Sequence, residues 1–224
     1  MKNTMFLITS RSGGIEMILS QIELDGNRYK TIKALKNPVE FHRSIQKALA
    51  QERKKCLWRV DELRGKKYLL IVSEQPFEYP EILENEFGKK ESPLKYKDYD
   101  PFLFSINDGS IWRFKLKGNP VRREKANGMK NGAYRQLFTV EDQIKWLERR
   151  AENNGFKLIE VIPKKKEEYH FKKHREDKKY LTFQSITFEG TLEVTDFKKF
   201  KNLLCYGIGH GKAYGMGLFS VVRR

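Results

Sequence analysis

Residues 207–217 read GIGHGKAYGMG, a run with five glycines, one lysine and one histidine near the end of the chain. A glycine backbone can approach a ligand closely because it has no Cβ, and free N–H groups can then face an anion. Lys212, in the middle of the run, would add a positive charge to such a site. The run lacks the GxxxxGK[ST] spacing of a P-loop. A turn packed tightly against a neighbouring domain is the alternative. The positive charge of Lys212 favours an anion-binding site over such a turn.

His42 is the second residue that could do chemistry. Its imidazole can accept or donate a proton near neutral pH, because its ordinary pKa is about 6.5. Proton transfer by such a group contributes roughly 10²- to 10⁴-fold to a reaction that needs a general acid or base. A single histidine beside an apolar helical stripe is more often a hydrogen-bonded structural residue, so spacing alone does not assign His42 to catalysis.

Residues 164–180, KKKEEYHFKKHREDKKY, form a charged run between two predicted strands. Charge runs are usually solvated loops. Because strand-forming sequence flanks this one, it would be held at its base, in a geometry that can press lysines against phosphates. His170 and His174 are spaced i, i+4, but a zinc site needs three or four ligands. The sequence supplies no nearby set of acidic and cysteine residues to complete such a site, so no metal is predicted.

The charge of the chain points to a polyanionic partner. Lysine and arginine number 45 against 29 acidic residues in 224, a formal net charge of +16. Nucleic acid is the leading candidate. No apolar run approaches the roughly 20 residues of a membrane-spanning helix, and the first residues do not form a secretory signal, so we expect a cytoplasmic protein. Cys56 and Cys205 have no CxxC partner and are expected to be buried apolar residues.

Strands and helices alternate through the chain. The apolar patterns and turn residues predict strands at 5–9, 16–24, 56–63, 68–74, 102–106, 111–118, 156–162, 180–194 and 217–222. They predict helices at 38–49, 140–155 and 195–207, and a short, weakly periodic one at 79–90.

This alternation predicts an α+β protein with two tandem ferredoxin-like, or RRM-like, domains, in which helices cover one face of each antiparallel sheet. The N-terminal domain is expected to span 17–97 and to carry His42. The C-terminal domain is expected to span 98–224 and to carry the basic hairpin and the glycine-rich loop. The stretch 91–101 has many charges and two prolines, so we interpret it as the linker.

Several stretches together resemble the CRISPR RNA-processing endoribonuclease of the type I-E Cascade complex, the CasE family. They are FHRSIQKAL, LWRVDE with YLLIVSEQP, RFKLKGNPVRRE, QIKWLERRAE, FEGTLEVTD and GIGHGKAYGMGLFSVV. The most specific are the histidine of the first helix, the FEG-x-L strand and the closing glycine-rich loop with its lysine. The resemblance spans nearly the whole chain and implies the same tandem fold. It aligns Met17 with the usual start of the family, so residues 1–16 are expected to be an N-terminal extension.

The family cuts the repeat hairpin of precursor CRISPR RNA and keeps the mature guide RNA in Cascade. The resemblance therefore implies a metal-independent endoribonuclease that leaves a 2′,3′-cyclic phosphate and a 5′-hydroxyl. The implied partners are the repeat hairpin, the guide RNA and other Cascade subunits, without a membrane or a cofactor. His42 would transfer a proton and Lys212 would supply a cation, with Lys47 as the second cationic candidate. The tyrosine common in the family is Val39 here, and His210 is an alternative acid.

We expect three groups of residues to bind RNA, and we expect Trp146 and Leu147 to be buried in the core. The groups are the glycines of the loop, a basic helix face, and the hairpin segment: Gly207, Gly209, Gly211, Gly215, Gly217; Lys145, Arg149, Arg150; and Lys172, Lys173, Arg175, Lys178, Lys179.

Two other functions remain open. A non-catalytic protein that binds structured RNA would have the same charge and fold, although the RNP aromatic pattern of RRM domains is not evident in the strands. A metal-dependent nuclease would need clustered carboxylates, whereas the acidic residues here are interspersed with lysines.

Overall fold

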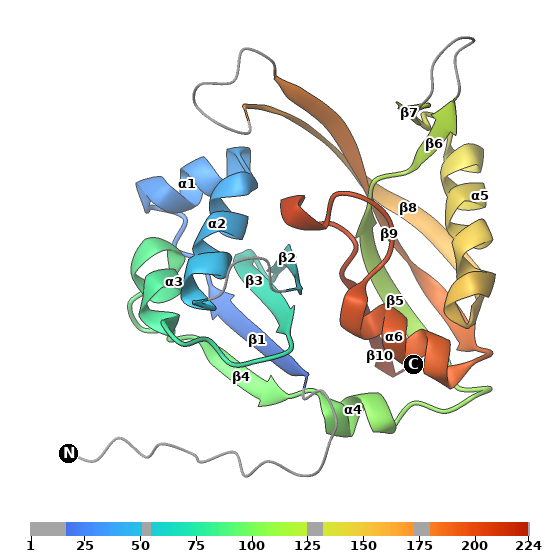
Figure 1. Ribbon diagram of the computed structural model, residues 1–224, viewed down its shortest axis with the longest axis horizontal. Helices are drawn as coiled ribbons and strands as arrows, with labels where there is room; N and C mark the ends of the chain where they lie inside the picture. The colour runs from blue at the N-terminus through green and yellow to red at the C-terminus, as the bar shows by residue number, and fades with distance from the viewer. Residues whose placement is uncertain (1–16, 51–54, 125–131, 173–179, 224) are drawn as a thin grey trace.

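The computed structural model describes residues 17–50, 55–124, 132–172 and 180–223 (Figure 1). The first of two four-stranded antiparallel sheets contains β1 (Ile18–Glu23), β2 (Cys56–Leu63), β3 (Lys66–Ser73) and β4 (Lys95–Asp98). Their order in the sheet is β2-β3-β1-β4. Helices connect β1 to β2 and β3 to β4, which is the βαββαβ pattern of a ferredoxin-like domain.

The second sheet contains β5 (Ile111–Gly118), β8 (Phe156–Phe171), β9 (Leu181–Val194) and β10 (Phe219–Arg223), in the order β10-β5-β9-β8. Counted within the sheet, both orders are 4-1-3-2. The sequence-based prediction of tandem ferredoxin-like domains is therefore confirmed. A small hairpin of β6 (Val121–Glu124) and β7 (Ala133–Gln136) is inserted between β5 and the helix that follows.

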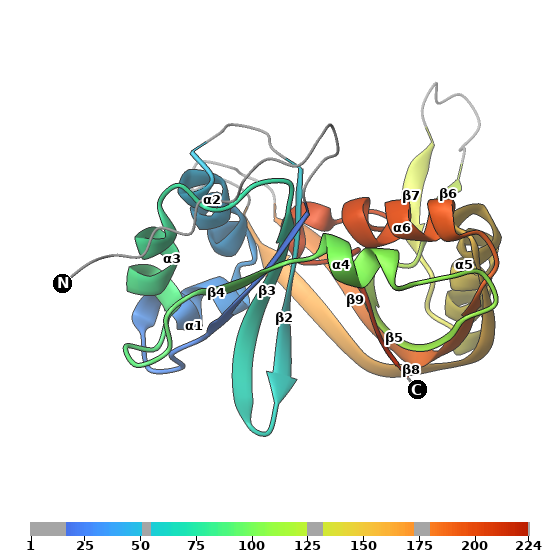
Figure 2. The ribbon, with the colours of Figure 1, turned by 90° about the horizontal axis from the view of Figure 1, so that it is seen from below.

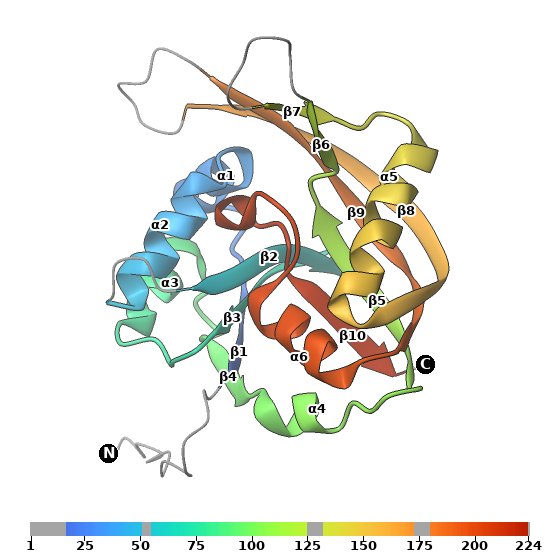
Figure 3. The same cartoon turned by 45° about the vertical axis from the view of Figure 1, so that its right-hand side comes forward.

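Helices cover one face of each sheet (Figures 1 and 3). On the first sheet they are α1 (Tyr29–Lys36), α2 (Val39–Ala48) and α3 (Pro80–Phe87), and on the second α5 (Val140–Ala151) and α6 (Phe197–Tyr206). No helix among the described residues is both long enough and apolar enough to cross a membrane.

Helix α2 forms because apolar residues recur on one of its faces. Phe41, Ile45 and Ala48 are each at most 1% exposed, and the Phe41 ring packs against the rings of Trp58 and Phe87 at centroid distances of 5.5 and 4.7 Å. Because the apolar face of α2 packs in this way, its opposite face, which carries the more polar residues, is turned away from the sheet.

The two sheets share buried contacts. Leu57 and Val72, from the first sheet, belong to the hydrophobic core of the second half. Arg59 of β2 is 2% exposed and makes two hydrogen bonds to the Asp61 carboxylate, at 2.9 and 2.7 Å. The same guanidinium donates to the carbonyl oxygens of Lys115 and Leu218. Every strong donor of this buried cation therefore has a partner, and β2 is tied to β5 and to the end of the glycine-rich loop.

The interpretation of 91–101 as a linker is wrong in part, because it contains strand β4, which pairs with β1. All four residues of β4 are exposed, so the strand has no apolar alternation, and lysines are common on such sheet edges. The strand predicted at 102–106 is also wrong. Here the chain forms helix α4 (Asp100–Phe104), which has a proline in its first turn. Figure 2 shows β4 running into α4, which leads to the second sheet.

Other predicted elements agree with the structure. The weak helix at 79–90 is α3, and the helix at 140–155 begins with a cap in which the Asp142 N–H donates to Thr139 Oγ1 at 3.1 Å. The predicted strand at 5–9 and the N-terminal extension lie outside the described residues. The two sheets lie on either side of the expected 97/98 boundary, apart from Asp98 at the end of β4. The division into two domains there stays a prediction.

Candidate functional site

His42 lies on α2 and is half-buried. Its Nδ1 atom is buried and has no hydrogen-bond partner among the described residues. Burial also lowers the pKa of His42 below its ordinary value of 6.5, because the imidazolium would lose hydration. Because Nδ1 is buried, Nε2 is the ring nitrogen that we consider for proton transfer, and the lowered pKa favours the uncharged imidazole at neutral pH.

Lys212 begins η2 (Lys212–Tyr214), a short 3₁₀ turn in the glycine-rich loop. Its Nζ donates to the carbonyl oxygen of Tyr206, the last residue of α6, at 2.6 Å. Cations are stabilised at helix C-termini because unpaired carbonyls gather there. Burial, and then the charge of Lys55, lower the pKa of Lys212. Its ammonium group is thus fixed in place and less costly to deprotonate than that of an exposed lysine.

The structure brings the two predicted catalytic elements together. The η2 turn lies against α2, although the two segments are far apart in the sequence. Figures 1 and 3 show the loop reaching from the second half of the molecule to α2. His42 and Lys212 are therefore on adjoining elements at the junction of the two halves, as a shared site requires.

The glycines of the loop have two structural reasons to be glycine. All five, at 207, 209, 211, 215 and 217, have φ between +68° and +87°, a region that other residues rarely adopt. A Cβ on Gly215 would lie 2.6 Å from the Trp58 ring, and one on Gly207 would lie 2.7 Å from a methyl carbon of Leu57. Tight packing against β2, the alternative left open by the sequence, therefore accounts for these two glycines. Contact between the glycine backbone and RNA stays a prediction.

Lys47 is exposed and lies five residues after His42, which is about 140° around the helix. Although burial works against it, the pKa of Glu86 in α3 is lowered by its hydrogen-bonding neighbours and by the charge of Lys47. Lys47 is therefore close to α3, and its role as a cation at the site stays a prediction.

The basic residues of α5 differ in exposure. Trp146 and Leu147 are buried, as predicted. Arg150 is half-buried, with its guanidinium 4.1 Å from the centre of the Trp146 ring. Lys145 and Arg149 are exposed and, together with Arg122 of β6, line a groove of about 340 Å³ that also contains Asp142 and Glu148. Lys145 and Arg149 are thus more available to a phosphate than Arg150.

The charged run at 164–180 is strand over much of its length. The β8–β9 ladder continues to the pair Phe171 and Leu181, so residues 164–171 belong to a hairpin and not to a loop. Lys172 follows, with its Nζ 5.4 Å from the centre of the Tyr180 ring. Lys173, His174, Arg175, Lys178 and Lys179 lie outside the described residues. Within the described ranges, no three histidine, cysteine or acidic residues are grouped as metal ligands would be.

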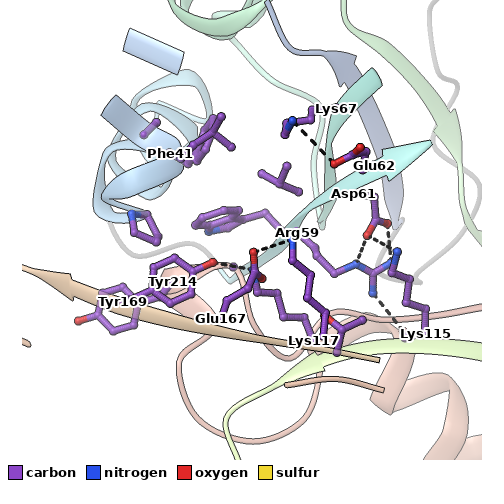
Figure 4. A pocket seen from close by; sticks show the side chains of 18 of the residues that line it. Phe41, Arg59, Asp61, Glu62, Lys67, Lys115, Lys117, Glu167, Tyr169 and Tyr214 are labelled. Atoms are coloured by element: carbon purple, nitrogen blue, oxygen red, sulfur yellow. Dashed lines mark hydrogen bonds and ion pairs between the residues drawn. The ribbon is translucent and has the colours of Figure 1, made fainter. Parts of the chain in front are cut away.

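A cavity of about 220 Å³ lies between the two halves, beside Tyr214 of η2 (Figure 4). Lys117, 8% exposed, donates to the Tyr169 hydroxyl at 2.6 Å and pairs with Glu167 at 2.5 Å. Burial opposes the charge of Lys117, but these two partners raise its pKa. On the other side, Asp61 pairs with both Arg59 and Lys115. Lys117, Arg59 and Lys115 are thus each paired with a carboxylate, and we interpret the cavity as part of the junction.

Sequence reasoning missed two features beside the loop. The Nζ of Lys55 lies 5.4 Å from the centre of the Tyr206 ring, so Lys55 and Lys212 approach the same residue. The ring of Tyr134, in β7, lies 4.5 Å from that of His210. Each contact joins residues more than 70 positions apart, and no local pattern in a single sequence could reveal it.

Comparison with known proteins shows the family of this chain. The family described as "CRISPR associated protein" matches residues 17–223. The CRISPR-associated endoribonuclease Cse3 of Thermus thermophilus is 32% identical in an alignment 218 residues long, which covers 92% of this chain and 99% of Cse3. A structure of Cse3 bound to a 19-nucleotide RNA has a TM-score of 0.75 at 30% identity, covering 92% of this chain and 99% of that one.

The crystal structure of Cas6e from Escherichia coli strain K-12 has a TM-score of 0.67 at 21% identity, covering 92% of this chain and all of that one, and it shares the fold. The resemblance drawn from the sequence is thus confirmed. This chain belongs to the CRISPR-associated protein family, with Cse3 among its relatives.

Proposed function

We propose that this protein is a metal-independent endoribonuclease of the cytoplasm, which cuts the repeat hairpin of precursor CRISPR RNA at the 3′ base of its stem. It keeps the mature guide RNA for the Cascade complex. The relatives support this: one structure is of Thermus thermophilus Cse3 with an RNA representing a pre-cleavage complex. A second relative, 29% identical over 125 residues, is the Cascade subunit CasE of Escherichia coli. The contact between α2 and η2 is the observation that carries the proposal.

The reaction begins at the 2′-hydroxyl beside the scissile phosphate. His42, uncharged because burial lowers its pKa, accepts the hydroxyl proton at Nε2. The 2′-oxygen attacks phosphorus, the bond to the 5′-oxygen breaks, and the leaving oxygen takes up a proton. The products are a 2′,3′-cyclic phosphate and a 5′-hydroxyl.

Lys212 acts on the charge that builds up on the phosphorane. A positioned ammonium stabilises such charge strongly when water is partly excluded, and the Tyr206 carbonyl keeps the Lys212 side chain in one place. Val39, at the position of the family tyrosine, cannot transfer a proton. Lys212, with its lowered pKa, is therefore our first candidate for the proton donor to the leaving oxygen.

Binding follows from charge and shape. The β8–β9 hairpin, with Lys172 near its end, and the exposed Lys145 and Arg149 of α5 would hold phosphates of the stem. An A-form stem hides its base edges in a deep major groove, so its backbone is the accessible feature.

The test uses purified protein and a repeat hairpin in EDTA. We expect one cut, a 2′,3′-cyclic phosphate, and no cut when the nucleotide that supplies the 2′-hydroxyl is 2′-deoxy. Tight binding without a cut, with or without added Mg²⁺, would instead indicate the non-catalytic RNA-binding protein. Cleavage that appears only after Mg²⁺ is added would indicate a metal-dependent nuclease.

A further inference from the structure

Two exposed aromatic rings meet beside the glycine-rich loop and have no part in the mechanism above. Tyr134 lies on β7 of the inserted hairpin and His210 lies in the loop. Their ring centroids are 4.5 Å apart and the rings are tilted by 54°. Tyr134 is 55% exposed, and His210 is exposed as well. The pair therefore leaves aromatic surface open to solvent.

The loop backbone holds His210 close to the proposed reaction. His210 precedes Lys212 by two residues. Next to it, a Cβ on Gly209 would lie 3.1 Å from the Trp146 ring of α5, so the backbone rests directly on the core. The His210 ring thus projects from a supported segment.

The surroundings are cationic. Arg123 and Arg135 are exposed on the same small hairpin, and Lys145 and Arg149 line the neighbouring groove. Glu124 pairs with Arg135 and Arg122 and offsets part of this charge. Exposed aromatic rings among cations are typical of surfaces that stack nucleobases while the cations hold phosphates.

A purely structural contact between hairpin and loop is the alternative. A purely structural contact would stabilise the fold most if both rings were buried, because burial removes apolar surface from water. Tyr134 is 55% exposed, so the contact leaves more than half of this side chain's surface free to meet a nucleobase.

We propose that Tyr134 and His210 form a stacking platform for one RNA nucleobase next to the scissile linkage. The proposal rests on the proposed function, since Lys212 sets where that linkage lies. Loss of a base–aromatic stack weakens binding by roughly 5- to 150-fold.

The experiment uses a repeat hairpin with a 2′-deoxy nucleotide at the cleavage position, which binds but is not cut. 2-Aminopurine replaces, one position at a time, the two nucleotides that precede the scissile linkage and the two that follow it. We expect wild-type protein to change the fluorescence at one position. Tyr134→Ala and His210→Ala should abolish that change and weaken binding 5- to 150-fold, whereas Tyr134→Phe and His210→Phe should retain both.

Tyr96→Ala is the matched control, because Tyr96 is 59% exposed on β4 of the other sheet. Thermal unfolding of each variant checks that it folds. The proposal is overturned if no position responds to wild-type protein, or if Tyr134→Ala behaves like Tyr96→Ala. Slower cutting with unchanged fluorescence and affinity would also overturn it, in favour of a structural contact if both alanine variants behave so, or of the alternative acid role if only His210→Ala does. Failure of the proposed function looks different, since the wild type would then not cut the all-ribose hairpin in EDTA.

Discussion

The ammonium of Lys212 donates a hydrogen bond of 2.6 Å to the carbonyl oxygen of Tyr206, and the ammonium of Lys55 lies 5.4 Å from the ring of the same tyrosine. The two lysines are 157 positions apart in the sequence, since 212 − 55 = 157. Their proximity gives Lys212 a neighbouring positive charge, which adds to the effect of burial in lowering its pKa.

Lys55→Met should raise the pKa of Lys212, because it removes that neighbouring charge and leaves a side chain of similar length. If Lys212 is the proton donor, the alkaline limb of the cleavage rate should move to higher pH, since the protonated form then persists further. Single-turnover rates between pH 7 and 10 measure the shift. Lys198→Met, an exposed lysine on α6, is the control. An alkaline limb that stays in place or moves to lower pH would contradict the assignment.

The acid limb of the dependence of cleavage rate on pH reports the protonation of His42. Because burial lowers the pKa of His42, the base form should persist below pH 6.5, and the cleavage rate should fall only as pH drops through the lowered value. The unfolded state binds this proton more readily, so the contribution of His42 to stability is present above pH 6.5 and is lost as pH falls through the folded-state pKa. An NMR titration of the His42 ring in the free protein measures that pKa. A value at or above 6.5 would remove the physical basis for the base role.

Gly215→Ala should destabilise the protein, because the residue has a φ of +77° and an added Cβ would lie 2.6 Å from the Trp58 ring. The left-handed backbone costs roughly 1–2 kcal/mol for an alanine, and the close contact adds about 1–3 kcal/mol. Urea unfolding measures the loss.

Gly26→Ala is the matched control for this experiment, since nothing lies within 4 Å of a Cβ there and the position carries no positive φ. Its free energy of unfolding should change by less than about 1 kcal/mol. Equal stability of the two variants would mean that the loop does not pack against β2 as described.

Lys145→Ala combined with Arg149→Ala should weaken binding of the repeat hairpin and flatten its salt dependence. Each phosphate contact contributes about 0.7 to 0.9 to the slope of log affinity against log salt, so two lost contacts should reduce the slope by about 1.4 to 1.8. Binding titrations from low to moderate salt measure this.

Lys157→Ala combined with Lys198→Ala removes the same charge from exposed positions away from the groove and provides the control. A slope that changes equally in both double variants would indicate an effect of net charge and not of a defined contact.

The helices and strands that could be predicted are those whose buried apolar residues recur at regular spacing along the sequence. Elements without such a repeat were missed. Helix α2 was predictable because Phe41 and Ile45 lie on one apolar face. Helix α1 was missed because its fully buried residues, Thr31 and Ala34, are small or polar, while Ile32 is 42% exposed. Strand β4 was missed because none of its residues is buried.

The sequence likewise predicted only part of the candidate site. His42 and Lys212 could be singled out because a helix position and a glycine-rich run carry a local signature and a family resemblance. Lys55 could not be found, since its place beside Tyr206 depends on how β2 packs against the second half. The contact of Tyr134 with His210 was hidden for the same reason, because the β6–β7 hairpin that carries Tyr134 was not predicted.

The most direct test of the account measures single-turnover cleavage of a repeat hairpin by His42→Ala, Lys212→Ala and the double variant, alongside affinity for the uncleavable 2′-deoxy hairpin. We predict that each single change slows cleavage by roughly 10²- to 10⁴-fold with affinity within a few-fold of wild type. The double variant should be little slower than the worse single one, because the two groups act on one linkage. Wild-type cleavage rates in either single variant, or a cleavage rate and an affinity that fall together, would contradict the proposal that His42 and Lys212 catalyse the cut.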